Sequence, residues 1–241
     1  MKYILETIAF NIDSCAKAQS AGAHRIELCD NPAEGGTTPS YGFIKAARLA
    51  VTIQLYPIIR PRGGDFLYSD AEFEIMKADV QVCKDLGCDG VVIGMLNEDA
   101  TIDKKRSGIL VNLAYPMGVT FHRAFDRVID PQAALEDVIA IGCERILTSG
   151  SHPTASESAE NIRELIEAAD GRIIIMPGSG VRADNIVMLA ERTGAVEFHS
   201  SARMNVETNM KISNTLMNET TTSVTVNEEE LRMMIAKLNN L

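Results

Sequence analysis

Eight short apolar runs, each followed by a segment with helical spacing, constrain the fold of this chain more than any other feature. The runs are expected to be strands at residues 3–9, 24–29, 52–59, 89–95, 119–122, 144–148, 172–176 and 195–199. Strands that alternate with helices pair in parallel, because a parallel connection must cross back over the sheet. Eight such units in 241 residues predict a single-domain α/β fold, a TIM-type (β/α)₈ barrel over residues 1–241. A doubly wound open sheet is the alternative.

Local signals at the helix starts accompany this alternation. Asp13 is placed to cap the first helix, and Thr38, followed by proline, to cap the second. Ser69 and Glu72 have the spacing of a capping box before a long amphipathic run. These residues predict where three of the helices begin.

The composition changes after the eighth expected strand. Residues 205–226 are rich in Thr, Asn and Ser, which indicates a long loop or a flap. A last helix follows, with Leu231, Met234, Ile235 and Leu238 on one stripe. The chain is therefore expected to end with a loop and a helix that belong to the barrel domain.

The net charge and the number of cysteines limit the kinds of molecule that this chain is expected to bind. Asp and Glu number 33 against 23 Lys and Arg, and the net charge of −10 opposes binding to nucleic acid or an anionic membrane. No apolar run approaches the roughly 20 residues that span a bilayer, and no secretory signal is recognisable. Five cysteines without a CxxC pair predict neither a disulfide framework nor a structural zinc site. We expect a cytoplasmic protein that binds a small molecule or a metal ion.

Polar side chains gather where the expected strands end, and TIM barrels hold their active sites at that end. The fifth strand runs into His122 and then Asp126, and the eighth ends on His199. Alternation points Glu27 of the second strand inward. Histidines and carboxylates are the usual general acids and bases, so Glu27, His122, His199 and Asp126 are the candidate catalytic residues. Glu6 could join them. The alternatives are core histidines and, for Glu6, a buried ion pair.

A second group of residues has the character of an anion site. Arg60 and Arg62 flank a proline in the loop after the third strand, and arginine presents planar donors to carboxylates and phosphates. A Gly-Ser-Gly turn after the seventh strand can offer backbone N–H groups to an anion. The full set of candidates is Arg60, Arg62, Thr148, Ser149, Gly178, Ser179, Gly180 and Ser200. Solvated loop arginines and an ordinary tight turn are the alternatives.

Six motifs together are more specific than any of these signals alone. They are RIELC at 25–29, EGGTTPS at 34–40, IRPRGGDF at 59–66, TFHRAFD at 120–126, ILTSG at 146–150 and EFHSSA at 197–202. In combination they resemble the motifs of the CutC family over about residues 1–204. The resemblance implies a TIM-type barrel, a cytoplasmic homodimer or higher homo-oligomer, and an assignment to copper homeostasis with proposed copper(I) binding.

Cys29 is the metal ligand that this resemblance implies. Alternation places Cys29 on the same strand face as Glu27, whereas the other cysteines look like small core residues. Some relatives have a second cysteine on the third strand, but this chain has Gln54-Leu55-Tyr56 there. It also has Ser179 within a turn that is usually three glycines. A copper site with two thiolates is therefore not expected.

Two functional hypotheses follow. The first is a copper-handling protein that binds copper(I), for which soft ligands should dominate the site. The second is a barrel enzyme or binding protein for a small phosphorylated or carboxylate metabolite. The one inward thiol and the many hard or borderline groups favour the second hypothesis, and the family resemblance favours the first. Whether the chain is an enzyme remains open at this point.

Overall fold

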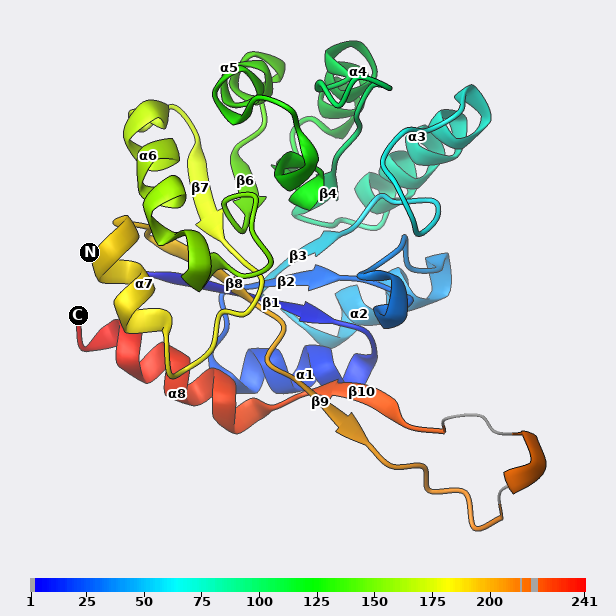
Figure 1. Ribbon diagram of the computed structural model, residues 1–241. Coiled ribbons are helices and arrows are strands. Elements are labelled where there is room, and N and C mark those ends of the chain that lie inside the picture. The colour runs from blue at the N-terminus through cyan, green and yellow to red at the C-terminus, as the bar shows by residue number, and fades with distance from the viewer. Residues whose placement is uncertain (1–2, 213, 218–220) are drawn as a thin grey trace.

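Eight parallel strands form a barrel, and helices surround it, in the computed structural model, which describes residues 3–212, 214–217 and 221–241 (Figure 1). The strands are β1 (Ile4–Ala9), β2 (Arg25–Leu28), β3 (Gln54–Pro57), β4 (Gly90–Ile93), β5 (Gly118–Phe121), β6 (Arg145–Thr148), β7 (Ile174–Pro177) and β8 (Glu197–Ser200). The helices are α1 (Ile12–Ala21), α2 (Tyr41–Ala50), α3 (Asp70–Asp85), α4 (Lys104–Ala114), α5 (Pro131–Ile141), α6 (Ala159–Ala169), α7 (Ile186–Thr193) and α8 (Glu228–Asn239).

The strand order closes the barrel. One set of hydrogen-bonded strands has the order β3-β2-β1-β8 and the other β4-β5-β6-β7, and all neighbours are parallel. The sets meet where the N–H of Ile59 donates to the carbonyl of Val92 at 2.8 Å, and β7 packs beside β8. Because β1 pairs with both β2 and β8, the first and last barrel strands are neighbours. The predicted (β/α)₈ barrel is confirmed, and the open sheet is excluded.

The helix caps are only partly as predicted. Asn11, not Asp13, caps α1, and its side chain accepts from the N–H of Ser14 at 2.8 Å. The prediction failed because α1 begins one residue before Asp13. Ser40, not Thr38, caps α2, and the Thr38 hydroxyl instead accepts from the N–H of Arg60 at 2.8 Å. The capping box of Ser69 and Glu72 at the start of α3 is confirmed.

An antiparallel hairpin lies between β8 and α8. Its strands, β9 (Arg203–Val206) and β10 (Ser223–Val226), occupy both ends of the stretch expected to be a loop, of which residues 213 and 218–220 lie outside the described part. Figure 1 shows the hairpin projecting away from the barrel. Its base is tied to α1, because Asn11 Nδ2 donates to the carbonyl of Val224 at 2.7 Å. The hairpin is therefore fixed to the barrel at its base.

Short 3₁₀ helices mark the loops at the carboxyl ends of the strands. They are η1 (Pro32–Glu34), η2 (Arg123–Arg127) and η3 (Ala155–Ser158), and a fourth, η4 (Thr215–Met217), lies in the hairpin. The first three follow β2, β5 and β6, so these loops are ordered turns and not extended connections. They form the rim of the barrel mouth.

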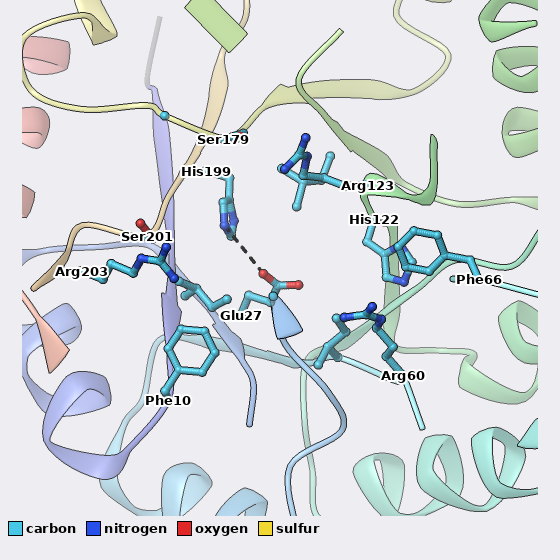
Figure 2. A pocket seen from close by; sticks show the side chains of 15 residues that line it. Phe10, Glu27, Arg60, Phe66, His122, Arg123, Ser179, His199, Ser201 and Arg203 are labelled. Carbon is cyan, nitrogen blue, oxygen red and sulfur yellow. Dashed lines mark ion pairs between the residues drawn. The ribbon is translucent and has the colours of Figure 1, made fainter. Parts of the chain in front are cut away.

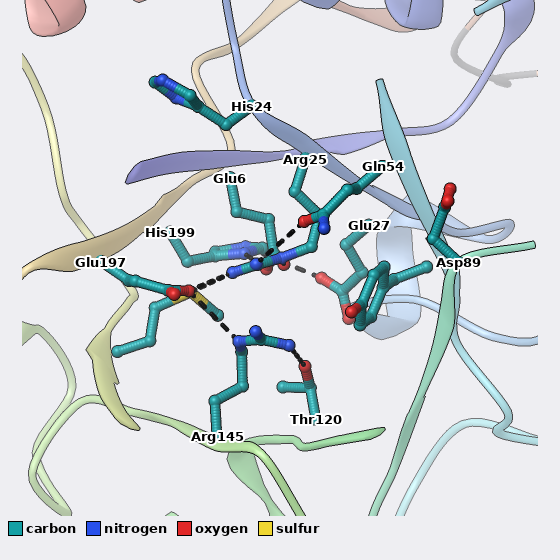
Figure 3. Close-up of polar contacts among 12 residues, drawn as sticks. Glu6, His24, Arg25, Glu27, Gln54, Asp89, Thr120, Arg145, Glu197 and His199 are labelled. Atoms are coloured by element: carbon teal, nitrogen blue, oxygen red, sulfur yellow. Dashed lines mark hydrogen bonds and ion pairs between the residues drawn. The ribbon is translucent and has the colours of Figure 1, made fainter. Parts of the chain in front are cut away.

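The inside of the barrel carries paired charges (Figure 3). Arg25 donates to Glu6 and, at 2.5 Å, to Glu197, and Arg145 Nε donates to Glu197 at 3.2 Å. The guanidinium groups of Arg25 and Arg145 lie 5.3 and 5.4 Å from the ring centre of Tyr56. Buried charges are tolerated only when they are paired and hydrogen-bonded. This network places a fixed set of charges directly beneath the mouth.

Candidate functional site

A cavity of about 300 Å³ opens at the carboxyl ends of the strands (Figure 2). Six of the residues predicted from the sequence line it: Glu27, Arg60, His122, Ser179, Gly180 and His199. They come from β2, β8 and the loops after β3, β5 and β7. Parallel strands deliver their ends to one face of a barrel, so residues far apart in the sequence meet there.

His199 lies between two buried glutamates at the base of this cavity (Figure 3). Its Nδ1 is 2.6 Å from Oε1 of Glu6, and its Nε2 is 3.7 Å from Oε2 of Glu27. Burial alone would lower the pKa of His199, but the hydrogen bond with Glu6 and the charges of both glutamates raise it. Burial opposes ionisation of Glu6 as well, yet Arg25 and His199 hold its pKa at about 2. Glu6 therefore stays ionised.

Glu27 is the member of this cluster that faces the cavity. It is 4% exposed, and burial together with the negative charge of Glu6 raises its pKa to about 7, although His199 acts against the shift. No donor closer than the 3.7 Å contact with His199 approaches its carboxylate in the described chain. A carboxyl group that titrates near neutrality in a cavity has the properties of a general base.

His122 is held in one orientation and one charge state. Its Nδ1 accepts a hydrogen bond from the N–H of Ala124 at 3.1 Å, so a neutral ring carries its proton on Nε2. Burial and the charge of Arg60 lower its pKa to about 3. Among the described residues, buried Nε2 has no hydrogen-bond partner. At neutral pH, His122 is a donor and not a base.

Gly94 makes room for the His122 ring. A Cβ atom at Gly94 would lie 2.3 Å from Cε1 and 2.4 Å from Nδ1 of His122. Phe66 covers the ring, with centroids 4.9 Å apart. The imidazole is thus fixed by packing on two sides as well as by its hydrogen bond.

The two predicted arginines have different surroundings. Arg60 is 6% exposed and lines the cavity, and its Nη atoms donate to the carbonyls of Glu34, Gly36 and Gly64 at 2.6–2.9 Å. Arg62 lies outside the cavity lining and pairs with Asp65 and Glu72 at 2.8 and 2.6 Å. Arg60 gives the cavity positive charge while it holds two loops together, and Arg62 ties its loop to the first turn of α3 through Glu72.

Asp126 organises the turn after β6 and does not reach the cavity lining. It accepts from the Thr148 hydroxyl at 2.5 Å, from the N–H groups of Ser149 and Ser151 at 3.0 and 3.2 Å, and from Arg123 Nε at 2.7 Å. Thr148 and Ser149 are fully buried with this carboxylate. The structure therefore places these three candidates together, one layer behind the cavity.

The turn after β7 reaches the cavity with its second and third residues. Ser179 and Gly180 have φ of 72° and 71°, the left-handed region that glycine adopts readily. The Ser179 hydroxyl donates to the carbonyl of Pro153 at 2.7 Å, which holds the turn in place. Within the described chain, the N–H groups of Ser179 and Gly180 have no acceptor. Two backbone donors are thus free at the cavity wall.

Gly178 and Ser200 support the site from outside the lining. A Cβ at Gly178 would lie 2.3 Å from Leu147 Cδ1, so the Leu147 side chain packs directly on the Gly178 backbone and would have to move for a larger residue. Ser200 is 1% exposed, and its hydroxyl donates to the carbonyl of Val181 at 2.6 Å. Both residues fix the backbone around the turn after β7.

Sequence reasoning did not select several residues of the lining. Arg203 is the first residue of β9, and its exposed side chain reaches the cavity from the hairpin (Figure 2). Arg123, by contrast, was expected at the barrel mouth because it follows the end of the fifth strand; it lines the cavity, and its Nη2 donates to Ser149 Oγ at 2.8 Å. Phe10, directly after β1, could have been found by the strand-end rule. Arg203 gave no such signal, because it lies between the expected end of the eighth strand at residue 199 and the loop expected at residues 205–226.

Cys29 is not in the cavity lining but packs against Ile8 and Ile58, which are. It is fully buried against Ile8, Tyr56, Ile58 and Val92, and burial raises its pKa well above the usual value. In the described part of the chain, one group of three His, Cys, Asp or Glu side chains could hold a metal ion, and it comprises Glu6, Glu27 and His199. Copper(I) prefers thiolate and thioether ligands. The residues around Cys29 do not fit a copper(I) site.

These features define a TIM barrel with a charged cavity at the catalytic end of the strands. The CutC family model matches residues 3–204. The chain therefore belongs to the CutC family. None of the helices in the described residues is both long and apolar enough to cross a membrane.

The relatives and a solved structure agree with this assignment. The chain is 54% identical over 211 residues to a family protein CutC of Chromobacterium violaceum, covering 88% of this chain and 85% of that protein. It is 48% identical over 212 residues to the copper homeostasis protein cutC homolog of Homo sapiens, covering 88% and 78%. A crystal structure named as copper homeostasis protein CutC from Streptococcus agalactiae has a TM-score of 0.79 and 36% identity, covering 83% of this chain and 98% of that chain.

Proposed function

We propose that this chain serves in copper homeostasis, the role that its mouse and human relatives carry in their names, each at 48% identity. The same family membership supports a cytoplasmic location and a homo-oligomeric state. Sedimentation of the purified protein tests the second of these. Direct binding of copper(I) at Cys29 has weaker support, because a buried thiol with a raised pKa and no neighbouring soft ligand binds copper(I) poorly.

The activity that the geometry supports best is binding of a small phosphorylated or carboxylate metabolite, with acid–base chemistry on it. One observation carries this proposal: Glu27, with a pKa of about 7, shares a cavity of about 300 Å³ with Arg60, Arg123 and Arg203. Three guanidinium groups attract an anion locally even though the whole chain has a net charge of −10.

The anion has donors on both sides of Glu27. Arg203 lines the cavity together with Ser179 and Gly180, whose N–H groups have no acceptor in the described chain and are available to an anion, as at other anion sites built from backbone. Arg60 contributes mainly charge, since three of its N–H groups are occupied by backbone carbonyls. Arg62 is outside the cavity and is not part of the proposed site.

Calorimetry tests the proposal with matched variants. The ligands are inorganic phosphate, sulfate, and a panel of three- to six-carbon phosphorylated and carboxylate metabolites. Arg203→Ala is expected to weaken binding of any ligand by roughly 1.5–3 kcal/mol, the scale of a lost charge-assisted hydrogen bond. Arg62→Ala is the control and should leave the affinity unchanged. A panel that shows no binding to the wild type would refute the proposed function.

A further inference from the structure

We propose that the cavity moves a proton at a carbon atom next to a carbonyl group, with Glu27 as the base and His122 Nε2–H as the donor to the carbonyl oxygen. This inference rests on the proposed function, because it names the substrate class and the reaction for the same site. The substrate is a small ketone or aldehyde with a C–H bond beside its carbonyl and a phosphate or carboxylate at its other end.

His122 supplies the donor. Its Nδ1 is occupied by the N–H of Ala124, and its Cε1–Nδ1 edge packs on Gly94. The remaining nitrogen, Nε2, is buried without a partner in the described chain, on a ring that lines the cavity. A buried donor that lacks an acceptor is energetically costly, so the site is arranged for an acceptor that a ligand brings. A carbonyl oxygen is such an acceptor.

The donor is matched to negative charge that develops on the ligand. Because His122 is neutral at physiological pH, it donates a hydrogen bond and does not protonate the ligand. The guanidinium of Arg60 faces His122 from the loop after β3 and adds positive charge on the same side. Donors and charges that are fixed before reaction stabilise an oxyanion without reorganisation.

Glu27 supplies the base. Its carboxylate lies between His199 on one side and His122 with Arg60 on the other (Figure 2). The groups that face it are His199 from β8, Glu6 from β1 and Arg25 from β2. None of these donates a close hydrogen bond to it: the nearest, His199 Nε2, is 3.7 Å away. A carboxylate free of strong donors keeps its lone pairs for a proton on the ligand.

The reaction balances without any further reactant. Glu27 takes the proton from the carbon next to the carbonyl. The electrons of that C–H bond form a C=C bond, and the carbonyl π electrons move to oxygen, which gives an enolate hydrogen-bonded to His122 Nε2–H. Glu27, now protonated, returns a proton to the same carbon, the C=C electrons reform the C–H bond, and the carbonyl group is restored. One negative charge passes from Glu27 to the ligand and back.

The anionic end of the ligand is expected to bind at the side of the cavity where Arg203 lies. Figure 2 shows Arg203 and Ser201 on the opposite side of Glu27 from His122 and Arg60. A ligand whose phosphate or carboxylate pairs with Arg203 therefore extends over Glu27 and presents its carbonyl to His122. The two ends of the cavity fix which carbon meets the base.

Exchange with deuterium tests the inference. The protein is incubated in D₂O with dihydroxyacetone phosphate, ribulose 5-phosphate, pyruvate or 2-oxoglutarate, and the carbon-bound protons are followed by NMR against samples without protein. We expect exchange with at least one of these. Glu27→Gln should slow it by ~10²–10⁴-fold and His122→Phe by ~10²–10³-fold, while the dissociation constants measured by calorimetry change little. Glu27→Asp, a more conservative variant, should retain measurable exchange.

The outcomes separate the inference from the proposed function. Binding of the probes without exchange above background overturns the inference and leaves the anion-binding function standing. Absence of binding overturns both. The ¹⁵N shifts of His122 in the wild type provide a readout that needs no variant: we expect a protonated Nε2 and an unprotonated Nδ1 throughout pH 5–8. A His122 ring that titrates in this range, or carries its proton on Nδ1, overturns the assigned role.

Discussion

Nδ1 of His199 lies 2.6 Å from Oε1 of Glu6 inside the barrel, and this contact lowers the pKa of Glu6 and raises that of His199. Glu6 also accepts from Arg25, so one carboxylate joins the base of the cavity to the ion pairs beneath it. The charge of His199 in the cavity therefore depends on the buried groups Glu6 and Arg25.

Replacement of Glu6 should destabilise the protein strongly. Glu6→Gln leaves Arg25 short of a buried counter-charge, and a broken buried pair costs roughly 3–5 kcal/mol. The pKa of about 2 lies below the ordinary 4.5, so the contribution of Glu6 is present above pH 4.5 and is lost as the pH falls through about 2. Urea unfolding at pH 7 measures the effect. Asp13→Asn, which breaks an exposed pair with Lys17, should cost below about 1 kcal/mol, and equal losses would contradict the prediction.

Glu27 should make the protein less stable as the pH rises. Its pKa is raised from 4.5 to about 7, so the folded state binds a proton that the unfolded state has released in this range. His199, Glu6 and Arg25 face the carboxyl group, and the raised pKa of His199 acts with the same sign. Glu27→Gln should therefore gain stability relative to the wild type between pH 4.5 and 8.5, by on the order of 2 kcal/mol. Unfolding curves at pH 4.5 and 8.5 measure this gain, and Glu98→Gln, at an exposed position, is the control. A gain of stability in Glu27→Gln that does not depend on pH would contradict the prediction.

Gly94 and Gly108 provide a matched pair of substitutions. An added methyl group at Gly94 meets His122 at 2.3 Å, whereas Gly108 in α4 has nothing within 4 Å of its Cβ position. Gly94→Ala should cost roughly 1–3 kcal/mol through overpacking, and Gly108→Ala should gain about 0.5–1 kcal/mol through helix propensity. Thermal unfolding distinguishes the two. Unchanged ¹⁵N shifts of His122 in Gly94→Ala would show that the ring does not depend on this packing.

Copper(I) binding by the folded protein should not depend on Cys29. Its thiol is buried and protonated, and a soft metal needs more than one accessible soft ligand. In competition with a copper(I) chelator, the wild type, Cys29→Ser and the control Cys143→Ser should therefore behave alike. Urea should increase binding by exposing thiols. Wild-type protein that removes copper(I) from the chelator, when Cys29→Ser does not, would place the ligand at Cys29.

The barrel could be predicted from sequence because each of its strands is an apolar run with a clear boundary. The exact caps could not, since Asp13 and Asn11 are both good cap residues and only the backbone at Ile12 decides between them. The same limit applies to Thr38, because its hydroxyl accepts a hydrogen bond from the N–H of Arg60, a residue 22 positions away.

The site was predictable to the extent that it follows strand ends. Glu27, His122 and His199 were found this way. Arg60 and Arg62 look equivalent in sequence, and the carbonyl groups of Glu34 and Gly36, in the loop after β2, distinguish the cavity residue from its neighbour. The charge states of Glu27 and His122 could not be predicted from the sequence either. They depend on burial and on contacts such as the hydrogen bond from the N–H of Ala124 to His122.

The proposed site joins one residue of the hairpin of β9 and β10 to residues of the barrel strands. Arg203 enters the cavity from the hairpin, while Glu27 and His199 belong to the barrel strands and His122 directly follows one. The family model ends at residue 204, so Arg203 lies within the matched segment and almost all of the remaining hairpin lies beyond it. A chain built in this way can change the length and sequence of its hairpin beyond Arg203 while the barrel strands that carry Glu27 and His199 keep their positions.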